Sequence, residues 1–284
     1  MIFRPPRGWT KGGRSGSLVG GGLMVPGLLL ERERELAVMS EALARARAGT
    51  QAVLLIEGQA GIGKTALLEQ AHGQAEALGM HVLAARGGEL EGRFPFGVVR
   101  QLFEPVIREM PTRERREALA GAAELAAPLV AGKHAPAAAA EDRSSKDRSS
   151  SVSHGLYWLT ANLSERSSLL LAIDDLHWAD APSLRFLLFL VRRLAGLPVA
   201  LVMCARSGET PEATLLTRLA AEPAVEVLRP AGLSAPAAAT LIRDRLGEQP
   251  AAQFVTACLA ATGGIPFLLL ELIAVLAADG LRPT

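Results

Sequence analysis

Short apolar runs alternate with amphipathic segments along most of this sequence. Continuous apolar stretches of strand length, typical of buried parallel strands, occur at 51–57, 80–87, 167–175, 197–209 and 224–230. Apolar residues recur at helical spacing at 28–48, 63–78, 94–110, 113–131, 152–165, 182–196 and 211–222. From 234 to 280 the pattern is helical only. This order predicts an α/β fold, with a parallel five-stranded sheet flanked by helices and a small helical lid domain at the C-terminal end.

Breaks in the pattern indicate how the chain is organised. They divide it into a disordered tail over 1–27, an α/β core over 28–230 and a helical lid domain over 231–284. Within the core, the stretch 135–151 is rich in serine and in charges of both signs, which predicts a flexible surface loop. We also expect the helix over 94–110 to be interrupted or to end near Pro105, because an internal proline removes a backbone hydrogen bond.

The stretch between the first apolar run and its helix has the composition of a phosphate-binding loop. Its residues, GQAGIGKT at 58–65, match the pattern G-x-x-x-x-G-K-[ST]. Glycines let backbone N–H groups wrap around phosphate oxygens, and the following helix presents its N-terminus to the anion. In such a loop Lys64 reaches the β- and γ-phosphates and the Thr65 hydroxyl ligates Mg²⁺. The predicted ATP-binding residues are Gly58, Gln59, Ala60, Gly61, Ile62, Gly63, Lys64, Thr65 and Ala66.

Two carboxylates end the third apolar run. An acid that leaves a buried strand beside a phosphate loop can hold Mg²⁺, and we assign this role to Asp174. Asp175 can then orient or deprotonate the attacking water. Two acids that cap an unrelated helix are the alternative, and the sequence does not decide which acid takes which role. Because Asp175 is shorter than the glutamate often found in fast ATPases, we expect weak or slow hydrolysis.

Arginines supply further candidate contacts to a nucleotide. Arg206 follows the fourth apolar run, and strand carboxyl ends line the ligand crevice of a parallel sheet, so it is a candidate sensor of the γ-phosphate. A surface arginine near a turn is the alternative. Arg192 and Arg193 are either fingers for the nucleotide of a neighbouring subunit or part of a solvated helix face. His177 follows the acids, but no second metal ligand lies near it in sequence, so no metal site is predicted there.

Composition narrows the classes of function. The formal net charge is +1, so the whole chain has no electrostatic preference for nucleic acid or an anionic membrane. No run reaches the roughly 18 uninterrupted apolar residues of a membrane span. Cys204 and Cys258 lie in apolar surroundings, which predicts buried free thiols and a reducing compartment. We therefore expect a cytoplasmic protein with no membrane contact and no direct DNA binding.

Several blocks together resemble a known family. They are GQAGIGKTALL, FPFGVVRQLFEPVI, HGLYWLTANL, LLLAIDDLHWADAPSLRFLLFLVRRL and TGGIPFLLLEL. Over about 28–282 the chain resembles the ATPase module of large ATP-binding LuxR-type transcriptional regulators, in the STAND group of AAA+-related signalling ATPases. The resemblance implies ATP and Mg²⁺ at the phosphate loop, Walker B acids at Asp174 and Asp175, and a sensor arginine at Arg206.

Two further features of the family have counterparts here. The turn Gly264-Ile265-Pro266 is similar to the element whose proline packs near the nucleotide, which makes Pro266 a candidate contact. The early GRE turn of the family is Glu31-Arg32-Glu33 in this chain, without its glycine. Such regulators continue into helical repeats and a DNA-binding helix-turn-helix. This sequence contains no helix-turn-helix with a basic recognition helix. We therefore expect it to hold the nucleotide-dependent switch of such a regulator without the DNA-binding part.

The expected function is a nucleotide-dependent switch with slow ATP hydrolysis, in which ATP and ADP favour different lid positions. Self-association or a partner protein would carry the signal. A non-hydrolysing, nucleotide-dependent scaffold is an alternative that differs only in whether Asp175 works as a base. A small-molecule phosphotransferase is a second alternative, but the sequence offers no acceptor base apart from Asp175.

Overall fold

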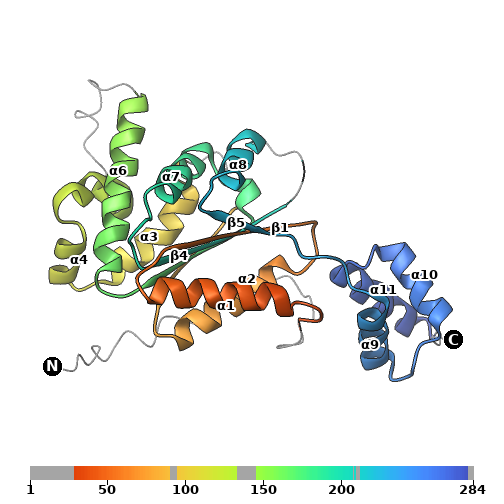
Figure 1. Ribbon diagram of the computed structural model, residues 1–284. Coiled ribbons are helices and arrows are strands. Elements are labelled where there is room, and N and C mark those ends of the chain that lie inside the picture. Colours follow the sequence, from red (N-terminus) through yellow and green to blue (C-terminus); the bar gives the residue numbers. More distant parts are fainter. Residues whose placement is uncertain (1–28, 90–94, 133–144, 207, 209–211, 281–284) are drawn as a thin grey trace.

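The computed structural model describes residues 29–89, 95–132, 145–206, 208 and 212–280. Within these ranges the chain forms an α/β domain and a separate group of three helices (Figure 1). The expected disordered tail over 1–27 and the first part of the expected loop over 135–151 lie outside the described residues.

A parallel sheet with the strand order β2-β3-β4-β1-β5 forms the centre of the α/β domain. Its strands are β1 (Ala52–Glu57), β2 (His81–Arg86), β3 (Leu169–Asp174), β4 (Val199–Ala205) and β5 (Val225–Leu228). β3 and β4 are buried along their whole length, as expected for central strands covered on both faces. The registry pairs Arg86 with Asp174 and Glu57 with Ala205, so these strands end at one edge. The predicted five-stranded parallel sheet is confirmed.

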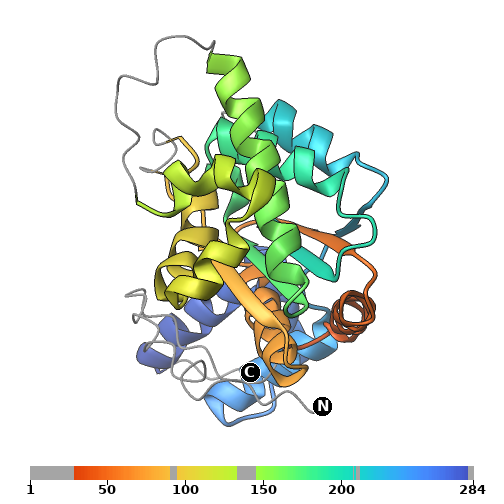
Figure 2. The same ribbon diagram turned by 90° about the vertical axis from the view of Figure 1, so that its left-hand side faces the viewer.

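Helices cover both faces of the sheet. They are α1 (Glu33–Arg47), α2 (Lys64–Ala77), α3 (Gly97–Glu109), α4 (Thr112–Ala118), α5 (Ala127–Val130), α6 (Ser145–Ser164), α7 (Ala181–Val191) and α8 (Ala213–Ala220). Side chains alternate along β1, so that Leu54 and Ile56 pack with α1 and α2, whereas Val53 and Leu55 belong to the core shared with the other helices. Figure 2 views the molecule from the end opposite the lid, with α4 and α6 nearest the viewer.

Three helix boundaries differ from the expected ones. α3 continues through Pro105 to Glu109, because buried apolar residues on both sides of the proline hold it against the core. The stretch expected to be helical over 113–131 divides into α4, the 3-10 helix η1 (Gly121–Ala126) and α5. Residues 145–151, expected in a loop, form the start of α6. Extending an existing helix is easier than nucleating one, so the packed part of α6 supports this polar extension.

One buried carboxylate joins two helices. Asp180 is the N-cap of α7 and accepts hydrogen bonds from the Ser183 N–H at 2.9 Å and its hydroxyl at 2.6 Å. The same carboxylate accepts the N–H groups of Phe96 at 2.7 Å and Gly97 at 2.9 Å, where α3 begins. Unpaired N–H groups at helix N-termini need such acceptors. Asp180 therefore fixes the start of α3 relative to the segment that follows β3.

The C-terminal helices form a lid with its own small core. They are α9 (Ala235–Leu246), α10 (Ala252–Thr262) and α11 (Pro266–Ala278). Buried residues from all three, including Ile242, Cys258 and Leu269, form an apolar cluster separate from the two clusters of the sheet domain. Figure 1 shows these helices beside the end of the α/β domain that carries the loop between β1 and α2. No helix among the described ranges is long and apolar enough to cross a membrane.

Candidate functional site

The loop at 58–65 leads from β1 directly into α2. Gly61 has φ +79° and Gly63 has φ +104°, backbone conformations that glycine adopts most easily. Gly63 is the N-cap of α2, so the first N–H groups of this helix, which have no intrahelical acceptor, lie at the end of the loop. The Gly58 N–H is bonded to the Ala205 carbonyl of β4 at 3.2 Å, which anchors the start of the loop. This local geometry fits a phosphate cradle.

Lys64 folds back over the loop. Its Nζ donates hydrogen bonds to the carbonyl oxygens of Gly58 and Gln59, both at 2.9 Å. Burial lowers the pKa of Lys64, while Asp175 and Asp174 act in the opposite direction. Loop carbonyls thus hold the ammonium group at the position where phosphate oxygens could replace them.

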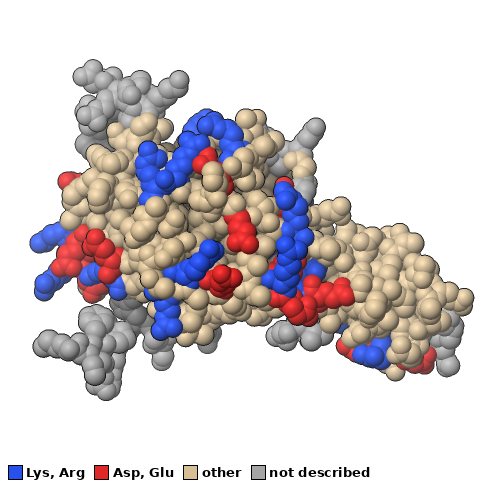
Figure 3. Space-filling model, in the orientation of Figure 1, with Lys and Arg blue, Asp and Glu red and all other residues tan. Residues whose placement is uncertain are grey.

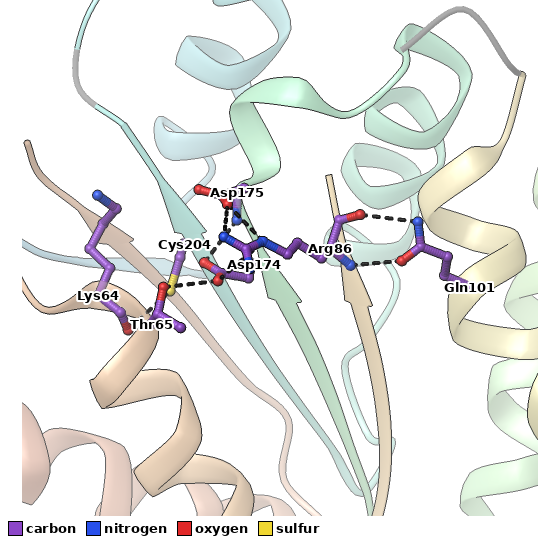
Figure 4. Close-up of polar contacts among 7 residues, drawn as sticks. All are labelled: Lys64, Thr65, Arg86, Gln101, Asp174, Asp175 and Cys204. Atoms are coloured by element: carbon purple, nitrogen blue, oxygen red, sulfur yellow. Dashed lines mark hydrogen bonds and ion pairs between the residues drawn. The ribbon is translucent and has the colours of Figure 1, made fainter. Parts of the chain in front are cut away.

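The two predicted Mg²⁺ ligands lie together, although they are far apart in sequence. The Thr65 hydroxyl donates to Asp174 Oδ2 at 2.9 Å, and the other oxygen of this buried carboxylate accepts the Asp175 N–H at 2.9 Å (Figure 4). Hydroxyl and carboxylate oxygens are the ligands that Mg²⁺ prefers. The donor set at the end of β3 and the start of α2 therefore fits this cation. Cys204 packs beneath it, with its thiol 3.5 Å from the Lys64 carbonyl.

Asp175 faces a different partner. Its Oδ2 accepts hydrogen bonds from Arg86 Nε at 2.9 Å and Nη2 at 2.7 Å, and the hydrogen bond to Asp175 raises the pKa of Arg86. Arg86 Nε also forms a longer ion pair with Asp174 Oδ2, at 3.9 Å. The main chain of Arg86 is held in turn by the Gln101 side chain on α3, through bonds of 2.9 and 3.0 Å (Figure 4). The predicted catalytic base is thus engaged by an arginine at the end of the neighbouring strand. Sequence reasoning missed Arg86, because its position beside Asp175 depends on the strand order.

The candidate arginines have different environments. Arg206 directly follows β4, is exposed, and makes no hydrogen bond or ion pair with another residue in the described ranges. Its charge lowers the pKa of both Lys64 and His177, secondary to their burial, so it lies within electrostatic range of the loop. At the end of α7, Arg192 Nε bonds to Glu222 at 2.9 Å, and the Arg193 guanidinium lies 3.7 Å from the Phe189 ring centre. Arg192 and Arg193 are therefore engaged within their own chain.

The lid touches the phosphate loop at two places. Pro266 begins α11, and the next N–H, that of Phe267, donates to the Gly61 carbonyl at 3.2 Å. A Cβ atom added to Gly61 would lie 2.7 Å from the Phe267 Cβ, so only glycine fits this contact. The buried Arg32 side chain forms the second connection. Its Nη2 donates to Ile62 O in the loop at 3.2 Å and to Ala231 O before the lid at 2.7 Å.

The turn at Glu31 adopts the conformation that the missing glycine would favour. Glu31 has φ +55°, in the left-handed region. Its carboxylate accepts hydrogen bonds from the Ser234 hydroxyl and, at 2.8 Å, from the Ser234 N–H at the start of α9. These bonds, the side-chain one first, lower the pKa of Glu31. The segment before α1 therefore holds the base of the lid through both Glu31 and Arg32.

The cysteines and the charged residues are arranged as the composition predicts. Both cysteines are buried and free, as expected, and burial raises the pKa of each thiol. Charged residues of both signs are interspersed over the face shown in Figure 3, in keeping with the small net charge.

The chain is similar to several known proteins. A protein-family model described as an AAA ATPase domain matches residues 28–203. The crystal structure of Cdc6p from Pyrobaculum aerophilum is 14% identical over 90% of this chain and 65% of that chain, with a TM-score of 0.53. The Orc1 protein of Aeropyrum pernix in complex with DNA is 19% identical over 89% of this chain and 62% of that chain, with a TM-score of 0.46.

A third solved structure is a STAND protein with a tetratricopeptide repeat sensor from Pyrococcus horikoshii. It is 17% identical over 85% of this chain and 29% of that chain, with a TM-score of 0.45. The chain thus spans less than two thirds of the length of each of these three structures. No curated protein matches the sequence. At these identities the likeness to Cdc6p shows a shared fold.

Proposed function

The chain belongs to the family of AAA ATPase domains, and from this premise we propose that it is an ATP-dependent switch with slow hydrolysis. The observation that carries the proposal is the direct contact between the phosphate loop and the lid. Phe267 of α11 is hydrogen-bonded to Gly61, and Arg32 joins Ile62 of the loop to Ala231 before the lid. A change in the loop therefore changes contacts that hold the lid. If ATP and ADP arrange the loop differently, they stabilise different lid positions.

The residues around the loop suit ATP with Mg²⁺. The Lys64 ammonium group would leave the loop carbonyls and bind the β- and γ-phosphates instead. Thr65 and Asp174 would hold the cation. Arg206 and Pro266 are proposed as further nucleotide contacts, at the end of β4 and the start of α11. When bound, Mg²⁺ would neutralise charge on the phosphates.

The partner of Asp175 supports slow hydrolysis. A general base must accept a proton from the attacking water, and here the carboxylate is paired with Arg86. The pair must separate or rearrange before Asp175 can act. The same observation favours a second candidate, a nucleotide-dependent scaffold in which the pair never separates and ATP is bound but not cleaved.

We place this switch in the cytoplasm, as the regulatory part of a LuxR-type transcriptional regulator. The motif blocks at the phosphate loop, around Asp174 and Asp175, and at Pro266 support this assignment by resemblance, and the buried free cysteines suit a reducing compartment. Self-association or a partner protein would then read the lid position, and we expect no direct DNA contact from this chain.

The first test is the nucleotide content of the purified protein. The chain and its Lys64→Ala variant would be denatured and the released nucleotide identified, and phosphate release would then be followed with added ATP and Mg²⁺. We expect ADP or ATP in the parent but not in the variant, with turnover well below the median enzyme rate of about 10 per second. Binding without turnover would favour the scaffold. No binding by the folded parent, or rapid turnover, would contradict the switch.

A further inference from the structure

Arginines gather around a hollow between α7 and α8, away from the phosphate loop. The hollow has a volume of about 320 Å³ and is lined by four exposed arginines, Arg185, Arg192, Arg193 and Arg218. Within the described ranges, no aspartate or glutamate lines it. Charges of both signs are spread over the face shown in Figure 3, but Lys and Arg side chains predominate above these two helices. A chain with a net charge of only +1 thus has a locally positive surface.

Helical spacing and helix packing bring these residues together. Arg185 and Phe189 are four residues apart on α7, and Arg193 follows four residues later in the turn that ends this helix, so the three share one face. Leu215 and Arg218 are three residues apart on α8, which packs against α7. The sequence of α7 therefore builds one wall of the hollow, and the packing of α8 supplies the other.

The four arginines are not equally engaged. Arg192 is bonded to Glu222, and the Arg193 guanidinium lies over the ring of Phe189. The guanidinium groups of Arg185 and Arg218 form no hydrogen bond or ion pair with the part of the chain that the structure describes. Positive charges that gather around one hollow repel each other and concentrate anions there. Arg185 and Arg218 are therefore the groups available to an anionic partner.

The rest of the lining indicates which anion fits. It is apolar and comes from Leu188, which is buried, and from the half-buried Phe189 and Leu215. Arginine, aromatic and apolar side chains together are typical of the centre of a protein interface. A guanidinium group pairs with a carboxylate through two parallel hydrogen bonds. Nucleic acid fits less well, because Arg193 covers a face of the aromatic ring on which a base would stack.

We propose that this α7–α8 surface binds an acidic segment of a partner protein. An apolar side chain of the segment enters the hollow, and carboxylates on either side of it pair with Arg185 and Arg218. The volume of about 320 Å³ is at the lower end of the range of ligand pockets, about 300–1,000 Å³, and so suits side chains rather than a large cofactor. The inference goes beyond the proposed function, because the surface includes none of the residues assigned to ATP or Mg²⁺.

The test measures binding of an acidic peptide by fluorescence anisotropy at about 50 mM salt. The labelled peptide has two central leucines with three acidic residues on each side. It would be titrated with the parent, with Arg185→Gln/Arg218→Gln, and with the control Arg34→Gln/Arg45→Gln. The control removes two exposed arginines from α1, on the opposite face of the sheet. We expect a loss of about five- to tenfold in affinity for the first variant and less than about twofold for the control.

Two altered peptides separate the apolar and the charged contribution. Replacing the leucines by glycine, or the acidic residues by their amides, should weaken binding to the parent by about tenfold or more. No binding of the original peptide, or an equal loss in both double variants, would overturn the inference. Equally tight binding of an eight-nucleotide oligothymidylate would overturn it too, because the surface would then prefer phosphates.

The inference and the proposed switch can fail separately. Lys64→Ala, which should lose ATP, is expected to bind the peptide as the parent does, and loss of peptide binding leaves nucleotide binding unchanged. The substituted arginines are exposed, so we expect the double variants to fold, and their melting temperatures would check this. If Arg185→Gln/Arg218→Gln does not fold, the altered peptides and the oligothymidylate decide with the parent alone.

Discussion

Asp174 and Asp175 are neighbours in sequence, but the proposed function assigns Asp174 to nucleotide binding and Asp175 to hydrolysis. On the binding side, Asp174 is buried and bonded to the Thr65 hydroxyl, next to the loop and its lysine. On the hydrolysis side, Asp175 is turned toward Arg86, whose main chain is held by Gln101. Arg86 Nε also lies 3.9 Å from Asp174 Oδ2, a longer ion pair than the one with Asp175 at 2.7 Å. The two residues proposed to hold the cation are thus in contact, whereas the proposed base is paired with an arginine.

The strength of this restraint can be bounded. The Arg86 side chain is 47% exposed and that of Asp175 is 16% exposed, so solvent screens the pair. Ion pairs of this kind contribute about 0–1 kcal/mol. A restraint of about 1 kcal/mol slows a reaction by roughly fivefold. In the proposed mechanism Arg86 would therefore moderate hydrolysis without blocking it, and a change in Gln101 or α3 could adjust its position.

The largest expected effect is on the binding side. Thr65→Val removes the hydroxyl with little change of shape, while Thr65→Ser keeps it. We expect Thr65→Val to lose about 10- to 100-fold in Mg²⁺-dependent ATP affinity, because a ligand and the partner of Asp174 are both removed. Calorimetric titration with ATP, in Mg²⁺ and separately in EDTA, would measure this affinity. Equal affinities of the Val and Ser variants in Mg²⁺ would contradict a metal role for Thr65.

A smaller effect is expected on the hydrolysis side. Arg86→Ala releases Asp175, and we expect phosphate release to rise by about two- to fivefold with ATP affinity nearly unchanged. Arg113→Ala is the control, because it removes an ion pair whose arginine is 90% exposed, on α4. Steady-state phosphate assays at saturating ATP would compare the three proteins. Slower phosphate release by Arg86→Ala would show that Arg86 assists the reaction. The proposal that Arg86 restrains Asp175 would then be wrong.

The smallest effect concerns the dependence of stability on pH. Burial lowers the pKa of His177 in the folded protein below its ordinary value of 6.5, so the unfolded chain binds more protons. This contribution to stability is present above about pH 6.5 and is lost as the pH falls below it, with a slope of at most about 1.4 kcal/mol per pH unit.

Urea unfolding at several pH values between 7.5 and 5 would measure this slope. His177→Phe should show a flatter decline than the parent, with the remaining slope partly due to His81, whose pKa is also lowered by burial. The same slope in both proteins would mean that His177 is not buried as described.

Sequence reasoning succeeded where the signal is local. The strands depend on short patterns of apolar residues, and all five were placed within a few residues. The lid was predicted only as a helical region over 234–280, without bounds for its three helices. Arg86 was missed because its partner is set by the pairing of β2 with β3, which no short pattern records. The burial of His177 was not predicted, because it depends on packing that no short pattern records. Pro105 was misjudged because packing of α3 outweighs the lost backbone hydrogen bond.

The carboxylate shared by α3 and α7 has a consequence for the order of folding. Phe96 and Asp180 are 84 residues apart in the chain, so the cap of α3 can form only after a long loop has closed. The loop between β1 and α2, by contrast, connects neighbours in sequence. Contacts between distant segments slow folding. We therefore expect the region around α3, which holds Gln101 and through it Arg86, to consolidate late, after β1 and α2 have joined.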